Sequence, residues 1–151
     1  MSFSDEVRTE IRRTINDRDK RFACLYGMLL YTRLFNETQI CIQSESAEVA
    51  ELVPKLFRTV FGAEPFSDEK EDGGLVSFTV NDTELAEKIM STYKINPSDR
   101  RLNIDNIANN STGAFLAGVF LVCGSVIDPN KEYHLEFVTP SAALCSDLNA
   151  V

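Results

Sequence analysis

Features that would mark several common classes of protein are missing from this sequence. Its four cysteines, Cys24, Cys41, Cys123 and Cys145, include no CxxC pair, so the sequence has neither zinc-ligand spacing nor a disulfide framework. The N-terminus MSFSDEVRTEIRR is charged within five residues and has no apolar stretch of the kind that signal peptides carry. The longest apolar run, about Ala114 to Ile127, is too short to span a bilayer. We therefore expect a cytoplasmic protein that has no membrane partner, no bound metal and no cofactor.

The sequence also has no excess of positive charge. Its formal net charge is −8, and residues 37–94 hold five basic side chains against twelve acidic ones. Residues 1–21 are nearly balanced, with six basic and five acidic side chains. Tight binding to DNA needs a basic patch, so this balance argues against strong DNA binding by this chain alone. The clustered cations are the candidate contacts for phosphate or an acidic partner: Arg12, Arg13, Arg18, Lys20, Arg21, Arg100 and Arg101.

What the sequence does have is a real hydrophobic core pattern, with 44% hydrophobic residues. Apolar residues recur every four positions from Phe3 to Ile15 and predict an amphipathic helix within residues 1–19, with Ser4 as its cap. A second helix is predicted from about Lys20 to Leu34. It is apolar nearly all round, so it should be central. A third, equally apolar helix is predicted over 112–123 and should stop at Gly124.

The segments around these helices alternate between strand and helix patterns. Residues 37–44 predict a strand with Gln39 and Gln43 on its polar face. A helix capped by Ser46 should follow and end at Gly62. Next come a hairpin turning at residues 72–74 and a helix that is capped by Asn81 or Asp82 and runs to about Tyr93. Residues 95–111 are polar and predict a linker with one helical turn. After the third helix we expect a turn at 128–130, a strand carrying His134 on its polar face, and a last helix opened by Pro140.

A hidden repeat connects these predictions. The order helix, strand, helix begins both at Lys20 and at Thr112, and Gly27 and Gly118 occupy matching places in the two apolar helices, since 118 − 27 = 91. Glycine in a helix interior costs about 1 kcal/mol relative to alanine, and close packing of two helices would offset that cost. We expect Gly27, Ala117 and Gly118 to bring the two helices together. The domain boundaries that follow are 20–94 for the first repeat, 95–111 for the linker and 112–151 for a partial second repeat.

The stretch AFLAGVFLVCGSV, followed by an Asp-Pro turn and YHLEFVT, resembles the second core helix and strand of the WhiA family of sporulation and cell-division regulators. The opening MSFSDEVRTEIRR is similar to the start of these proteins, and ACLYGMLLYTRLF matches their first core helix more loosely. The resemblance implies an α+β fold like that of the LAGLIDADG homing endonucleases. In that fold two pseudo-symmetric helix and strand repeats pack through two central helices; here the second repeat would be incomplete. It also implies a C-terminal helix-turn-helix domain in the family, to which nothing in this sequence corresponds.

In active LAGLIDADG enzymes an acidic residue at the foot of each central helix helps to hold divalent metal ions for phosphodiester hydrolysis. Aligning the two helices to that motif puts Thr32 and Cys123 at the acid positions, and neither is a hard anionic ligand for magnesium. We therefore expect no catalytic residue and no metal site. The resemblance implies a non-catalytic scaffold or interaction module of a DNA-binding transcriptional regulator located at the nucleoid, with DNA contacted chiefly through a domain not present in this chain.

Two alternatives remain open at this point. One is a divergent metal-dependent DNA endonuclease that uses acids outside the motif, such as Asp128 or Glu37. The other is a plain oligomerisation domain that pairs through an apolar flank of the last helix (Ala142, Ala143, Leu144 and Leu148) or through a sheet edge. Protein partners are also expected in the scaffold interpretation. The polar face of the predicted sheet would present Gln39, Gln43, Ser77, Thr79, His134 and Glu136.

Overall fold

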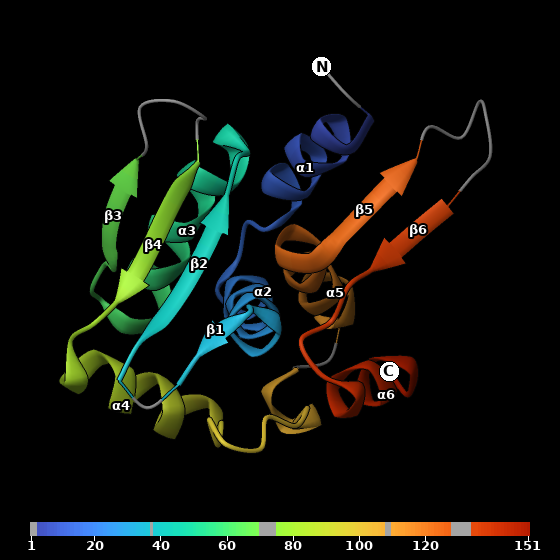
Figure 1. The fold of residues 1–151 in the computed structure, drawn as a ribbon. Coiled ribbons are helices and arrows are strands. Elements are labelled where there is room, and N and C mark those ends of the chain that lie inside the picture. Colours follow the sequence, from blue (N-terminus) through green and yellow to red (C-terminus); the bar gives the residue numbers. More distant parts are fainter. Residues whose placement is uncertain (1–2, 37, 70–74, 108–109, 128–133) are drawn as a thin grey trace.

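A computed structural model describes residues 3–36, 38–69, 75–107, 110–127 and 134–151; the side chains of 3–5, 69, 125–127 and 134–137 lie outside this description. Two apolar helices, α2 and α5, lie side by side at the centre (Figure 1). A four-stranded sheet lies on one side of this pair and a two-stranded sheet on the other, with helix α1 (Phe3–Thr14) at one end. The predicted α+β architecture with two central helices is confirmed.

The first half of the chain forms one complete repeat around α2. Its strands are antiparallel and lie in the order β1-β2-β4-β3, with α3 packed against α2 and β2. The elements are α2 (Arg18–Tyr31), β1 (Leu34–Phe35), β2 (Ile40–Ser44), α3 (Ala47–Phe61), β3 (Phe66–Glu69), β4 (Val76–Val80) and α4 (Thr83–Tyr93).

The second half starts the same order again: a helix, two antiparallel strands and a helix. Its elements are α5 (Thr112–Cys123), β5 (Gly124–Ile127), β6 (His134–Phe137) and α6 (Ala142–Asn149), preceded by a short 3-10 turn, η1 (Ile104–Asn106). Among the described residues β6 pairs with β5 alone, whereas its counterpart β2 pairs with strands on both sides.

Local signals in the sequence set several helix ends. Ser46 accepts a hydrogen bond from the Val49 amide and opens α3, and Gly62 ends it with a φ of 67°, a left-handed conformation that favours glycine. Asp82 accepts from the Glu84 amide and opens α4. These ends were predicted, as was the central place of α2, in which residues 23–31 are all buried. The turns predicted at 72–74 and 128–130 lie outside the described residues.

Other predicted boundaries were wrong. The helix predicted to reach Leu34 ends at Tyr31, because Thr32 turns to extended backbone and Leu34 pairs with Cys41 in the sheet. Strand β5 directly follows α5, in a segment that was interpreted only as a helix stop. Pro140 does not open the last helix, and α1 begins one residue before its expected cap, Ser4.

The burial of the last helix also differs from what the oligomerisation hypothesis expects. Ser141 caps α6 by accepting a hydrogen bond from the Leu144 amide, and the helix ends before Ala150. Leu144 was expected on an uncovered apolar flank, but it is fully buried, and its carbonyl accepts a hydrogen bond from the Tyr31 hydroxyl at 2.7 Å. Leu148 is partly buried against the core. The core of this chain therefore covers Leu144 and part of Leu148, while Ala142 stays exposed.

Residues 95–111 contain the predicted helical turn, but they are packed rather than loose. Arg100 donates from Nη1 to the carbonyl oxygens of Leu30 and Thr32, at 2.9 and 2.6 Å, where α2 leaves its last carbonyls without helical partners. Asn106 is buried and donates to the Tyr93 carbonyl at 2.7 Å. This segment ties the end of α2 to α4. No helix among the described residues combines the length and the apolar character that crossing a bilayer requires.

Candidate functional site

The two central helices cross at their glycines. A Cβ placed on Gly27 would lie 2.4 Å from the carbonyl oxygen of Phe115, and one placed on Gly118 would lie 2.0 Å from the carbonyl oxygen of Cys24. Both distances are far below van der Waals contact, so the backbones touch where only glycine fits. The two contacts are equivalent, since 118 − 27 and 115 − 24 are both 91. The crossing therefore has an internal twofold symmetry that relates the repeats.

Ala117, the third small residue, is partly buried and lines a hollow between α5 and α1, together with Ile11 and Ile15. Helix α1 also packs on α3 and on β5, so it contacts both repeats. Its Arg8 guanidinium lies over the Phe120 ring, 5.7 Å from the ring centroid. The N-terminal helix is thus an integral part of the helix pair's surroundings.

At the foot of the helix pair, the polar side-chain atoms of Thr32 and Cys123, at the two motif positions, form hydrogen bonds within the protein. Thr32 is buried and donates from its hydroxyl to the Cys41 carbonyl at 2.5 Å. Cys123 donates from its thiol to the Val119 carbonyl, one helical turn earlier, at 3.2 Å. Burial raises the pKa of the Cys123 thiol to about 11, so the sulfur stays protonated at neutral pH.

These two positions do not fit a divalent metal ion. Magnesium and manganese need anionic or carbonyl oxygens directed at a shared point, and a donating hydroxyl and a neutral thiol supply neither. Within the described part of the chain no cluster of three or more His, Cys, Asp and Glu side chains is arranged to hold a metal. Asp128 and Glu37, the acids considered for a divergent nuclease, lie outside the described residues.

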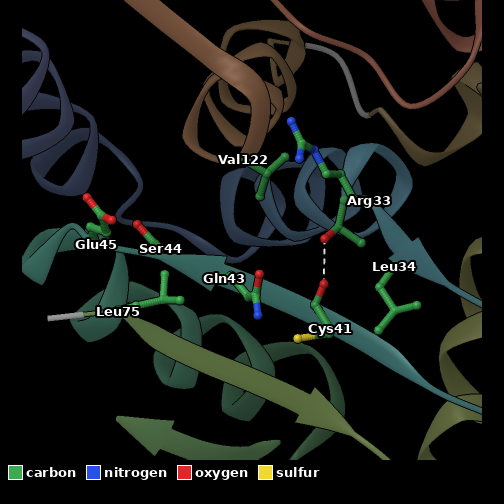
Figure 2. Close-up of a pocket in the computed structure, with 9 residues that line it drawn as sticks. Arg33, Leu34, Cys41, Gln43, Ser44, Glu45, Leu75 and Val122 are labelled. Carbon is green, nitrogen blue, oxygen red and sulfur yellow. Dashed lines mark hydrogen bonds between the residues drawn. The ribbon is translucent and has the colours of Figure 1, made fainter. Parts of the chain in front are cut away.

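A pocket of about 370 Å³ opens beside the foot of the helix pair, between β1, β2 and the end of α5 (Figure 2). Figure 2 shows Arg33 and Glu45 at opposite ends of the pocket, with Gln43 between them. Leu34, Leu75 and Val122 supply apolar walls. A second hollow of about 420 Å³ shares Glu45 and Val122 and extends toward Arg8, so the two together form a continuous depression.

Comparison with known proteins identifies this arrangement. Residues 112–151 match the family model described as the WhiA LAGLIDADG-like domain. A probable cell division protein WhiA from Thermoanaerobacter pseudethanolicus is 32% identical over 168 aligned residues, which cover 99% of this chain and 53% of that protein. A probable cell division protein WhiA from Clostridium novyi is 27% identical, over an alignment that covers 100% of this chain and 54% of that protein.

The chain is therefore similar to WhiA proteins over nearly its whole length. The solved structures agree at the level of the fold. The N-terminal LAGLIDADG domain of DUF199/WhiA has a TM-score of 0.61 at 18% identity, over 91% of this chain and 66% of that one. The full-length DUF199/WhiA from Thermatoga maritima has a TM-score of 0.63 at 18% identity, over 91% of this chain and 44% of that one. This chain spans about half the length of the curated WhiA relatives that it matches.

Most of the cations proposed as nucleic-acid or partner contacts have internal partners in this chain. Arg12 pairs with Glu48 and with Glu51, joining α1 to α3. Arg101 pairs with Asp147 through two hydrogen bonds of 2.8 and 2.7 Å. The remaining partners are Thr59 for Arg21, Asp17 for Lys20 and the α2 carbonyls for Arg100. Arg12, Arg21, Arg100 and Arg101 thereby join separate parts of the fold, whereas the Lys20–Asp17 pair is local to the start of α2. Arg13 and Arg18 are exposed and form no ion pair within the described residues.

The outer surface of the four-stranded sheet, which we call the saddle face, is defined by strand register. Leu34, Cys41, Thr79 and Phe66 form one row across all four strands, and Gln43, Ser77 and Asp68 form the next. Gln43 donates to the Ser77 hydroxyl at 3.2 Å. Gln39 lies in the loop before β2, and the side chains of His134 and Glu136 lie outside the described part. Sequence reasoning did not select Leu34 or Phe66, which are 39% and 65% exposed, since this requires the pairing of β1 and β3.

Proposed function

We propose that this chain is the non-catalytic LAGLIDADG-like module of a WhiA-type DNA-binding regulator of cell division and sporulation, and that it acts as a scaffold and interaction domain at the nucleoid. Similarity to WhiA proteins supports this, because these relatives carry the name of probable cell division protein WhiA. In this proposal, sequence-specific DNA recognition belongs to the part of those relatives that this chain does not span.

One observation carries the non-catalytic part of the proposal: the state of Thr32 and Cys123 at the foot of the helix pair. A nuclease of this fold needs two carboxylates facing each other there, and this chain has two neutral side chains whose polar hydrogens are donated to backbone carbonyls. The close helix crossing is retained, whereas the two carboxylates that metal-dependent cleavage needs are absent. The structural half of the motif, the glycine contacts, serves the fold in either case.

A plasmid-nicking assay tests the absence of catalysis. Supercoiled plasmid incubated with the protein and Mg²⁺ or Mn²⁺ should stay supercoiled on an agarose gel, at protein concentrations where a LAGLIDADG nuclease linearises it. Metal-dependent cleavage that disappears in Asp128→Asn or Glu37→Gln, but persists in the exposed control Glu87→Gln, would establish the divergent-nuclease alternative and refute the proposal.

An electrophoretic mobility shift tests where DNA specificity lies. With this chain alone, binding to duplex DNA at low salt should be weak and independent of sequence, because most clustered cations pair internally. Each phosphate contact adds about −0.9 to the slope of log affinity against log salt, so a shallow slope is expected. Tight binding to one promoter sequence over a scrambled one would place specificity in this module and contradict the proposal.

A further inference from the structure

We propose that the saddle face binds a protein segment that presents lysine or arginine beside an apolar side chain, with the pocket at the foot of the helix pair as the anchor for that apolar side chain. The inference rests on the proposed function in one respect, that this module is an interaction domain. It goes further by assigning the surface and the chemistry of its partner.

The charges on the sheet select a cationic partner and disfavour DNA. Among the described side chains of the first repeat's strands and their immediate ends, the acids are Glu45 and Asp68, and Arg33, just before β1, is the one cation. The other described cations of this repeat lie on α2, on α3 and at α4; for example, Arg58 pairs with Glu64 and Lys88 donates to the Phe61 carbonyl. A phosphate backbone on the saddle would meet these two carboxylates with Arg33 as the single described counter-charge, whereas a basic segment would be attracted to them.

Exposed apolar side chains supply the second half of the argument. Leu34 and Phe66 stand at opposite ends of the same row, on β1 and β3, and are 39% and 65% exposed. Between them the row contains only Cys41 and Thr79, so its middle is small and weakly polar. Interfaces bury apolar and aromatic anchors at their centre and keep charges at the rim. On the saddle the two exposed apolar side chains lie on the edge strands, and the carboxylates of Asp68 and Glu45 lie outside this row.

The pocket can hold an apolar side chain of the bound segment, and the charges at its two ends set the orientation of that segment. Its apolar walls, Leu34, Leu75 and Val122, surround a volume of about 370 Å³ that suits one large apolar side chain. Glu45 lines both this pocket and the adjoining hollow, and Arg33 lies at the opposite end (Figure 2). A bound segment would therefore place its basic residue at Glu45. A carboxylate of that segment would lie at Arg33.

Fluorescence anisotropy with labelled probes tests the inference. The probes are a peptide of alternating leucine and lysine, a glycine–lysine peptide of the same charge, a leucine–glutamate peptide and a duplex DNA. The leucine–lysine peptide should bind most tightly. Glu45→Lys should weaken its binding roughly tenfold, and Phe66→Ser should also weaken it. Glu87→Lys, the same charge change at an exposed position of α4, is the matched control and should leave the dissociation constant within about twofold.

Several outcomes would overturn the proposal. Equal losses in Glu45→Lys and Glu87→Lys would mean that the peptide responds only to net charge. Equal binding of the glycine–lysine peptide would remove the apolar anchor, and tighter binding of the duplex would make the saddle a nucleic-acid surface. NMR shift changes confined to a face other than the saddle would refute the site while leaving the interaction module intact. Plasmid cleavage would refute the proposed function independently.

Discussion

The helix crossing makes a sharp prediction about Gly118→Ala. A Cβ at this position lies 2.0 Å from the Cys24 carbonyl oxygen, and since carbon and oxygen normally approach to about 3.3 Å, the helices must separate locally by roughly 1.3 Å. Overpacking of this kind costs about 1–3 kcal/mol, and the neighbour is backbone with no rotamer to change, so the upper end applies. Alanine's helix propensity returns about 1 kcal/mol.

The expected net effect is a loss of about 2 kcal/mol, or a melting temperature about 4–8 °C lower for a chain of this size. Urea denaturation followed by circular dichroism measures the loss directly. Gly113→Ala is the matched control, because it lies in the same helix and no heavy atom lies within 4 Å of its added Cβ. That variant should be unchanged or slightly more stable, by up to about 0.5 kcal/mol. If Gly118→Ala were as stable as Gly113→Ala, the close crossing would be wrong.

Three further predictions follow from groups around the helix pair. Arg100→Met should cost about 1.5–3 kcal/mol in urea denaturation, because two carbonyls at the end of α2 lose a charged donor; no loss would refute that role. The hydrogen bonds from Arg101 hold the pKa of Asp147 below its ordinary value. The pair therefore stabilises the fold at every pH above the pKa of the Asp147 carboxyl in the unfolded chain, and this stabilisation is lost as the pH falls through the lower pKa of the carboxyl in the folded chain. Asp147→Asn should therefore lower the melting temperature at neutral pH and converge with the parent in acid; a difference independent of pH would contradict this. Burial raises the pKa of Cys24 to about 12, so a disulfide reagent at mildly alkaline pH should label exposed Cys145 first and Cys24 only on unfolding, with equal rates refuting the burial.

The parts of the fold that the sequence predicted well are those with local causes. A buried helix such as α2 shows in its uninterrupted apolar composition, and the ends of α3 show in Ser46 and Gly62, whose cap and left-handed turn are properties of single residues. The matching of Gly27 with Gly118 was visible as well, because an internal repeat gives two views of one contact.

The errors have non-local causes. Leu34 continues an apolar helical pattern and belongs to a strand only because Cys41 is there to pair with it. Strand β5 is four residues long and follows α5 without a loop, so no turn residue in the sequence indicates where it begins. Residues 95–111 read as a linker because their polar side chains have partners far away in the sequence, such as the Tyr93 carbonyl for Asn106 and the α2 carbonyls for Arg100.

The predictions for the candidate site show the same division between local and non-local causes. Alignment alone indicated that Thr32 and Cys123 replace the acids, but the carbonyl that each side chain donates to depends on the folded backbone. The candidate cations were selected by clustering in the sequence. Clustering does not reveal that Arg12 and Arg101 have carboxylate partners 36 and 46 residues away, since 48 − 12 = 36 and 147 − 101 = 46.

The two halves of the LAGLIDADG motif make separable physical demands, and this chain separates them. Close packing favours glycine at positions 27 and 118, because a methyl group at either place would collide with backbone and force the two helices of this chain apart. The acid positions carry no such demand, since Thr32 and Cys123 satisfy their own polar groups and leave no buried charge. Replacing two facing carboxylates by neutral groups removes mutual repulsion at the foot of the pair as well as the metal site. A domain released from metal chemistry in this way can retain its sheet as a recognition surface, and the charge and apolar pattern of the saddle face then decide which partner it recognises.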